Sequence, residues 1–277
     1  MAVLLALLAA LSWGSGDYLG GKASGRMHPV TVTASAQIVG LVGLLVATPL
    51  IGTEFSWRDA VWPGLGGAAG ALGLLLLYGA LAQGRVSVVA PITGLVSAGG
   101  PTLWGAAAGE RVGAWVVLGL TVGVVAIVAM SMEAPNSDAS WSIGRSIVVA
   151  VLSGVGFALF IVALDTAHDD AGVAPVLAAR VVSVPLLLLL AGRLQVPRIA
   201  SSQRLTVAAA GVLDTAANAM LVLALARGQL IVVTVLSSLY PAQTVLLARW
   251  FDGERLRRVQ QIGLALAAIA VVCITAG

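Results

Sequence analysis

The amino-acid sequence predicts an all-α integral membrane protein, with ten transmembrane helices arranged as two inverted five-helix repeats around a central cavity. Three observations support this prediction. First, 59% of the 277 residues are hydrophobic and only 10% are charged, whereas a soluble domain carries roughly 25% charged residues. Second, the chain contains ten apolar segments long enough to cross a bilayer. Third, its two halves resemble each other in sequence.

The ten predicted spans follow from length and hydropathy, because a transmembrane helix needs about 20 predominantly apolar residues. The spans are residues 2–20, 30–50, 61–82, 87–108, 112–132, 144–165, 172–191, 205–226, 230–251 and 257–276. The longest polar interruption, Glu133–Ser142, separates five spans from five.

The internal repeat appears when the chain is aligned with itself at an offset of 144 positions. Gly109-Glu110-Arg111 then falls on Gly253-Glu254-Arg255, and Ala80–Gly84 falls on Ala224–Gly228. Such self-similarity indicates a duplicated structural unit. The predicted organisation is a first repeat at 1–132, a linker at 133–143 and a second repeat at 144–277.

The basic residues predict the orientation. Eleven of them lie in or beside the odd-numbered loops and three on the opposite side, and cytoplasmic loops carry the excess of Lys and Arg. We therefore expect the odd loops in the cytoplasm and both termini outside. The eleven are Lys22, Arg26, Arg85, Arg145, Arg193, Arg198, Arg204, Arg249, Arg255, Arg257 and Arg258, and the three are Arg58, Arg111 and Arg227. This topology also accounts for the net charge of +3, so we expect no nucleic-acid partner.

The same charges indicate that the repeats are inverted. Loop 1 is basic, whereas its counterpart, loop 6, carries Asp165, Asp169 and Asp170. An odd number of spans per repeat makes the two copies face opposite ways, as this reversal of charge requires. Inverted repeats are characteristic of secondary transporters, whose substrate site lies near the bilayer midplane where the repeats meet.

Two five-helix copies, each with an Ala-Leu-x-x-Gly turn, a proline-containing span and a closing Gly-Glu, resemble the ten-helix EamA-type branch of the drug/metabolite transporter superfamily. The segment WGSGDYLGGKAS, Trp13–Ser24, also resembles the first helix of bacterial members. The resemblance covers nearly the whole chain. It implies a basket of ten helices in which helices 1, 3, 4, 6, 8 and 9 line most of a central cavity. It also implies export or exchange of small metabolites, amino acids or drugs by alternating access, without ATP.

We therefore predict a secondary transporter of the cytoplasmic membrane, and no enzymatic activity. The expected partners are the lipid bilayer and a small-molecule substrate, which is a metabolite, an amino acid or a drug-like solute. Aromatic and cationic solutes are candidates, protons are the candidate coupling ion with uniport as the alternative, and the chain is a monomer or a homodimer. The alternatives are a membrane-embedded enzyme of lipid or phosphate chemistry and a passive facilitator or channel. Neither GxxxxGK[ST] nor HExxH occurs, and Cys273 is the single cysteine, so we expect no metal and no cofactor.

Charged residues inside spans are costly and are functional candidates by default. Asp214 lies within the eighth span with Asn218 one turn later, and Arg180 lies within the seventh. Arg180 is a candidate for binding a substrate carboxylate, and Asp214 for binding an amine or carrying the coupling proton. The structural alternative is a fixed ion pair between neighbouring helices. Asp17, flanked by Lys22 and Arg26, is either a surface salt-bridge partner or a cavity residue.

Aromatic side chains are candidates for substrate contact by stacking and cation–π interaction. Trp13 and Phe157 occupy equivalent positions of the two repeats, and Tyr78, Trp104 and Tyr240 are further candidates. The alternative is that aromatic residues mark the membrane–water interface.

Glu110 and Glu254 are candidates for gating. The glycine before each permits a left-handed turn, and the carboxylate is expected to cap the next helix. The alternative is a gate in which each glutamate pairs with an arginine at the cavity mouth in one state only. Pro91, Pro101 and Pro241 are predicted hinges, because proline frees a backbone carbonyl and permits a kink. His168, Asp169 and Asp170 are expected to form a solvated loop rather than a metal site.

Overall fold

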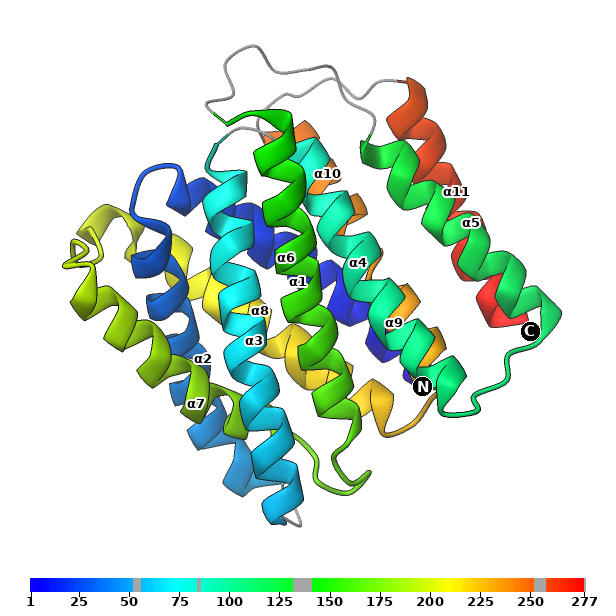
Figure 1. Ribbon diagram of the computed structural model, residues 1–277, viewed down its shortest axis with the longest axis horizontal. Coiled ribbons are helices and arrows are strands. Elements are labelled where there is room, and N and C mark those ends of the chain that lie inside the picture. The colour runs from blue at the N-terminus through cyan, green and yellow to red at the C-terminus, as the bar shows by residue number, and fades with distance from the viewer. Residues whose placement is uncertain (52–55, 84–85, 132–140, 252–257, 277) are drawn as a thin grey trace.

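The computed structural model describes residues 1–51, 56–83, 86–131, 141–251 and 258–276, which form a bundle of helices (Figure 1). No strand occurs within these ranges, which confirms the prediction of an all-α protein. In chain order the elements are α1 (Ala2–Ser24), α2 (Pro29–Ile51), α3 (Trp57–Leu81), α4 (Val86–Ala107), α5 (Ala114–Ser131), α6 (Ile143–Asp165), α7 (Ala174–Arg193), the 3-10 helix η1 (Ser201–Gln203), α8 (Arg204–Leu225), α9 (Leu230–Ser237), α10 (Tyr240–Phe251) and α11 (Arg258–Ala276).

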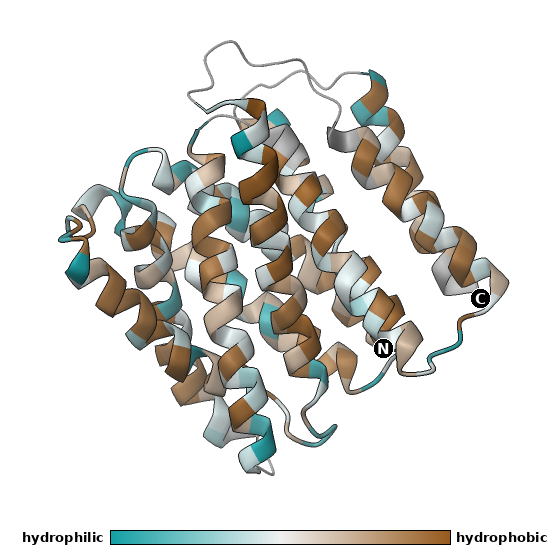
Figure 2. Ribbon diagram, viewed as in Figure 1, coloured by the Kyte–Doolittle hydropathy of each residue, from teal (hydrophilic) through white to brown (hydrophobic). Residues whose placement is uncertain are grey.

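The helices are apolar on the outside as well as the inside. Seven helical segments of the described part are long and apolar enough to cross a membrane, and Ala114–Ala126 and Arg258–Cys273 are shorter apolar helices. Large hydrophobic side chains such as Leu4, Leu8 and Leu11 of α1 are exposed. Apolar residues cover the helix bodies, and polar residues gather toward several helix ends (Figure 2). Helices that are hydrophobic all round suit a bilayer, and the chain is a multi-pass membrane protein.

The packing joins helices from the two halves of the chain. The α1 helix packs on α8, α3 packs on α6, and α5 packs on α11. In addition, α2 contacts α7 and α8, α3 contacts α7, and α4 contacts α6 and α9. Glycine makes several of these contacts close. Gly211 of α8 lies against the backbone of α2, where an added Cβ atom would be 2.3 Å from the carbonyl oxygen of Ala36.

The predicted span at 230–251 is interrupted in the structure. The α9 helix ends at Ser237, and α10 begins at Tyr240. Pro241 explains the interruption, because its missing N–H cannot bond the carbonyl of Ser237 and its ring clashes with that carbonyl. The chain crosses the break through tighter bonds, from Leu239 N–H to the Leu236 carbonyl at 3.3 Å and from Ala242 N–H to the Leu239 carbonyl at 3.0 Å. By contrast, Pro101 is buried within the continuous α4 helix, and the side chain of Pro91 lies outside the described residues.

The close contact at Gly211 yields a test of the packing. Gly211→Ala is expected to lower the free energy of unfolding by about 1–3 kcal/mol, because the new methyl group must displace the backbone of α2. Gly43→Ala in α2 is the matched control, since an added Cβ there meets nothing within 4 Å and alanine is the better helix former by up to about 1 kcal/mol. Denaturant unfolding in detergent, followed by circular dichroism, measures both. Equal stabilities of the two variants would contradict this packing.

Candidate functional site

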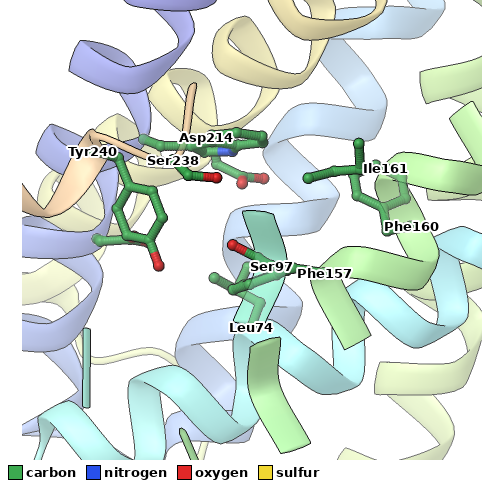
Figure 3. Close-up of a pocket in the computed structure, with 10 residues that line it drawn as sticks. Leu74, Ser97, Phe157, Phe160, Ile161, Asp214, Ser238 and Tyr240 are labelled. Carbon is green, nitrogen blue, oxygen red and sulfur yellow. The ribbon is translucent and has the colours of Figure 1, made fainter. Parts of the chain in front are cut away.

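Two adjoining cavities lie in the middle of the bundle and share five lining residues. The shared residues are Trp13, Leu74, Phe157, Phe160 and Asp214. Figure 3 shows Asp214, Ser238 and Tyr240 on one side of the first cavity, with Phe160 and Ile161 across from them. The cavity volumes are about 30 Å³ and 20 Å³, which is room for roughly one or two water molecules each. The described conformation therefore leaves room for only a few water molecules at this site.

Aromatic rings form much of the wall. Trp13 of α1 packs edge-on against Tyr240 of α10, with ring centroids 6.4 Å apart and ring planes at 72°. This is a favourable T-shaped geometry. The Tyr240 hydroxyl donates to the Ala90 carbonyl of α4 at 3.4 Å, which fixes the ring. Phe157 and Phe160 of α6 complete the wall, so the cavity presents ring faces and edges to whatever occupies it.

A charged pair lies beside this aromatic wall. The Arg180 guanidinium of α7 donates through Nη2 to Oδ2 of Asp214 in α8. Arg180 is 4% exposed and Asp214 is 7% exposed, so each charged group has lost most of its water. Asn218 supports the carboxylate by donating to Oδ1 of Asp214 at 3.2 Å and to its backbone carbonyl at 2.7 Å. Buried ion pairs are tolerated when further hydrogen bonds satisfy them in this way.

Asp17 is the second carboxylate of the cavity. It lies in α1, is 7% exposed and lines the same space as Asp214. Within the described part of the chain, its side chain makes no hydrogen bond or ion pair. The sequence allowed Asp17 to be either a surface salt-bridge partner of the basic end of α1 or a cavity residue. In the structure its side chain points inward, to the cavity. The lining thus contains two carboxylates and one guanidinium.

Several buried polar atoms around the pair lack a partner within the described residues. They are Nε of Arg180, Oγ1 of Thr215 and Oδ1 of Asn218. A buried polar atom without a hydrogen bond costs free energy. Arg180 and Asn218 border the second cavity, whereas Thr215 does not, so a polar group in that cavity is a candidate partner for the first two only. This arrangement can bind a molecule that carries both donors and acceptors.

The sequence reasoning missed some lining residues, among them Leu74, Gly70 and Ile161. The alignment of the two repeats could have identified them. Gly70 is offset by 144 positions from Asp214, Leu74 from Asn218 and Ile161 from Asp17. Apolar residues draw no attention in a search for chemistry, although their repeat counterparts do.

Two aromatic candidates lie away from the cavity. Tyr78 is fully buried between α1 and α3, where an added Cβ on Gly20 would be 2.1 Å from Cζ of Tyr78. Its hydroxyl is 3.5 Å from the Gly16 carbonyl, so Tyr78 contributes to helix packing. Trp104 is 55% exposed on α4 and is not among the residues that line the described cavities. Its outward direction suits a lipid contact.

Glu110 lies after α4 and caps a helix from the other half of the chain. Its Oε1 accepts the Leu230 N–H at 2.8 Å and its Oε2 accepts the Ile231 N–H at 3.0 Å. The preceding Gly109 has a φ of +95°, as the predicted left-handed turn requires. The expectation that the carboxylate caps the next helix, α5, is corrected, because the N–H groups it binds open α9. Its repeat counterpart Glu254 lies outside the described residues.

The loop after α6 is tied to the start of α3. Oδ1 of the buried Asp59 accepts the backbone N–H of His168 at 2.9 Å and lies 3.0 Å from Nδ1 of its ring. The ring remains half exposed. In the portion of the chain that the structure describes, no group of three or more His, Cys, Asp or Glu side chains is placed to hold a metal ion.

The chain is thus a polytopic helical membrane protein with internal cavities lined by aromatic and charged side chains. The family model for the EamA-like transporter family matches residues 1–132 and 140–276. The chain belongs to this family, which confirms the resemblance and the transporter character. A solved crystal structure matches with a TM-score of 0.77 at 21% identity, over 99% of this chain and 96% of that chain, which shows a shared fold. A search of curated proteins finds no match.

The buried pair yields a stability test. Asp214→Asn is expected to lower the free energy of unfolding by about 3–5 kcal/mol, because it leaves the Arg180 charge buried without its partner. The double variant Arg180→Met/Asp214→Leu should be far closer to wild type, since no buried charge remains. Denaturant unfolding in detergent measures the series. A double variant that loses as much stability as Asp214→Asn would show that the two side chains are not coupled.

The cap on α9 yields a second test. Glu110→Ala is expected to cost about 1–2 kcal/mol, because two N–H groups at a helix start lose their acceptor and a favourable charge is removed. Asp170→Ala is the control, since Asp170 is exposed in the loop after α6. Unfolding of both variants in the same detergent measures the difference. A Glu110 variant as stable as the control would count against the cap.

Proposed function

We propose that the chain is a secondary transporter that moves a small amine-bearing or aromatic solute across the cytoplasmic membrane by alternating access. The solute binds in the central cavity. The observation that carries this proposal is the composition of the cavity. Asp17 and Asp214 face it with only Arg180 to balance them, and most of the remaining wall is aromatic or aliphatic. The neutral polar side chains of the lining are Gln37, Ser97, Asn218 and Ser238. The family match favours transport over membrane-embedded enzyme chemistry.

The charge count points to the substrate class. Asp214 already has Arg180 and Asn218 as partners, whereas the described residues offer Asp17 none. A buried carboxylate is costly unless it has a partner, and either a substrate ammonium group or a proton supplies one. The rings of Trp13 and Tyr240 beside it suit a cationic or aromatic group. Amino acids, amines and drug-like cations combine these features.

We further propose that ten spans form two inverted repeats related through this cavity. Exchanging the repeats turns the α1–α8 contact into the α6–α3 contact, and the α2–α8 contact into the α7–α3 contact. The cavity lining follows the same exchange, because Trp13 and Phe157 both border it at an offset of 144 positions. Transport by rocking of one repeat against the other requires such a relation.

The proposed movement uses the break between α9 and α10. Ser238 lies at the break and lines the cavity, and the N-terminus of α9 is held by Glu110 of the first repeat. Irregular backbone inside a membrane is tolerated where it borders protein or a wet cavity. We propose that α9 and α10 tilt about this break to open the cavity, in the direction of export and with both termini outside.

Flux into proteoliposomes tests the proposal. The panel is amino acids and aromatic cations, measured for wild type, Asp17→Asn and Asp214→Asn with and without a pH gradient. With one proton exchanged per solute, a gradient of one pH unit should drive accumulation of about tenfold. Asp17→Asn should keep exchange of the solute but lose the response to the gradient. Asp214→Asn should lose flux in both conditions, because the unpaired Arg180 disrupts the site.

The exposed loop variant Asp170→Asn is the control and should behave as wild type. Wild-type flux that saturates but ignores the gradient would identify a facilitator or an exchanger, and Asp17 would then contact only the solute. Flux of panel solutes that is unchanged in both cavity variants would overturn the assignment of the site.

A further inference from the structure

A larger groove lies on the face of α1 opposite the central cavity. Ser15, Tyr18, Leu19 and Lys22 line it, and their spacing of three and four residues places them on one helix face. Trp13 and Asp17 project from the other face into the central cavity. The groove volume is about 490 Å³, so it holds far more than a few waters.

The groove continues into an exposed apolar face of α1. Leu4, Leu8 and Leu11 lie on the same face of α1 and are exposed, and they continue the line of the groove along the helix. Leu247 and Phe251 of α10 form an apolar side wall. An extended apolar chain that lies along α1 would cover this apolar surface.

One end of the groove is basic. Arg26 lines the groove and also a neighbouring cavity of about 540 Å³, which His28 and Arg198 border. Neither Arg26 nor Arg198 makes a side-chain hydrogen bond or ion pair within the described residues. Ser24 also borders this cavity, is only 5% exposed, and its Oγ has no partner among the described residues.

The basic cavity is held together by the fold. It lies between the turn that joins α1 to α2 and the segment that follows α7. The Thr31 hydroxyl ties these two segments by donating to the Pro197 carbonyl at 2.7 Å. Arg26, Arg198 and Ser24 therefore border one space, and guanidinium groups favour phosphate oxygens as acceptors.

We propose that this groove and basic cavity together bind an anionic phospholipid. The acyl chain lies along Leu19, Leu247 and Phe251, and the phosphate lies between Arg26 and Arg198 with the Ser24 hydroxyl as a further donor. A neutral headgroup leaves an excess of positive charge in the cavity, and a small free anion leaves the groove empty. Basic pockets beside transmembrane helices bind anionic headgroups at a membrane surface.

Native mass spectrometry tests the site on the full chain, purified in detergent with equal amounts of phosphatidylglycerol and phosphatidylcholine. Wild type should retain one phosphatidylglycerol in preference to phosphatidylcholine. Arg26→Gln and Arg198→Gln should each lower the bound fraction of phosphatidylglycerol by about fivefold, as the loss of one basic group near an anionic surface predicts. Leu247→Trp should reduce retention of lipid by filling the groove.

Arg193→Gln is the matched control, because Arg193 ends α7 nearby, is exposed, and does not border either cavity. It should bind lipid as wild type does. Equal binding of the two lipids, or equal loss in the Arg193 control, would overturn the proposal. A separate experiment adds millimolar inorganic phosphate as a competitor. If phosphate displaces the lipid and Leu247→Trp has no effect on lipid retention, the cavity is a phosphate site instead.

Discussion

The ion pair between Arg180 and Asp214 is the interaction on which the rest of this interior depends. Two charges in the middle of a bilayer protein are acceptable only if they meet, so α7 and α8 must place both side chains at one depth. The neighbouring α2 helix must also come close without a side chain in the way. Gly40 meets this need, because an added Cβ would lie 2.0 Å from Oγ1 of Thr215 and 3.4 Å from Nε of Arg180.

The short α9 helix shows how the fold satisfies backbone groups that a membrane leaves without water. Its first N–H groups bond to the Glu110 carboxylate from the other half of the chain. Its last carbonyls face the break that Pro241 enforces, next to the cavity. Both ends of α9 therefore depend on residues outside the helix. Glu110 joins the two halves of the chain at the start of α9, and the break at its other end borders the central cavity through Ser238.

Much of this could be predicted from the sequence, for physical reasons that differ from residue to residue. The all-helical membrane fold followed from hydropathy, since lipid imposes a simple rule on composition. The approach of Arg180 and Asp214 could be suggested because buried charges need partners. The partner of Glu110 could not, because any helix start offers the same N–H groups and only tertiary packing selects α9. The exposure of Trp104 and the inward direction of Asp17 likewise depend on how each helix is rotated.

The cavity combines a duplicated frame with chemistry that is not duplicated. Asp17 pairs by position with Ile161, Asp214 with Gly70, and Asn218 with Leu74, and all six border the central space. Each polar residue thus has an apolar counterpart in the other repeat. In the proposed inverted arrangement, the two repeats swap conformations during transport, and this swap changes which side of the membrane the cavity faces. The charged residues stay on their own helices throughout. A solute would then meet the same two carboxylates from either side of the membrane, and this constancy lets one site serve both states of a transporter.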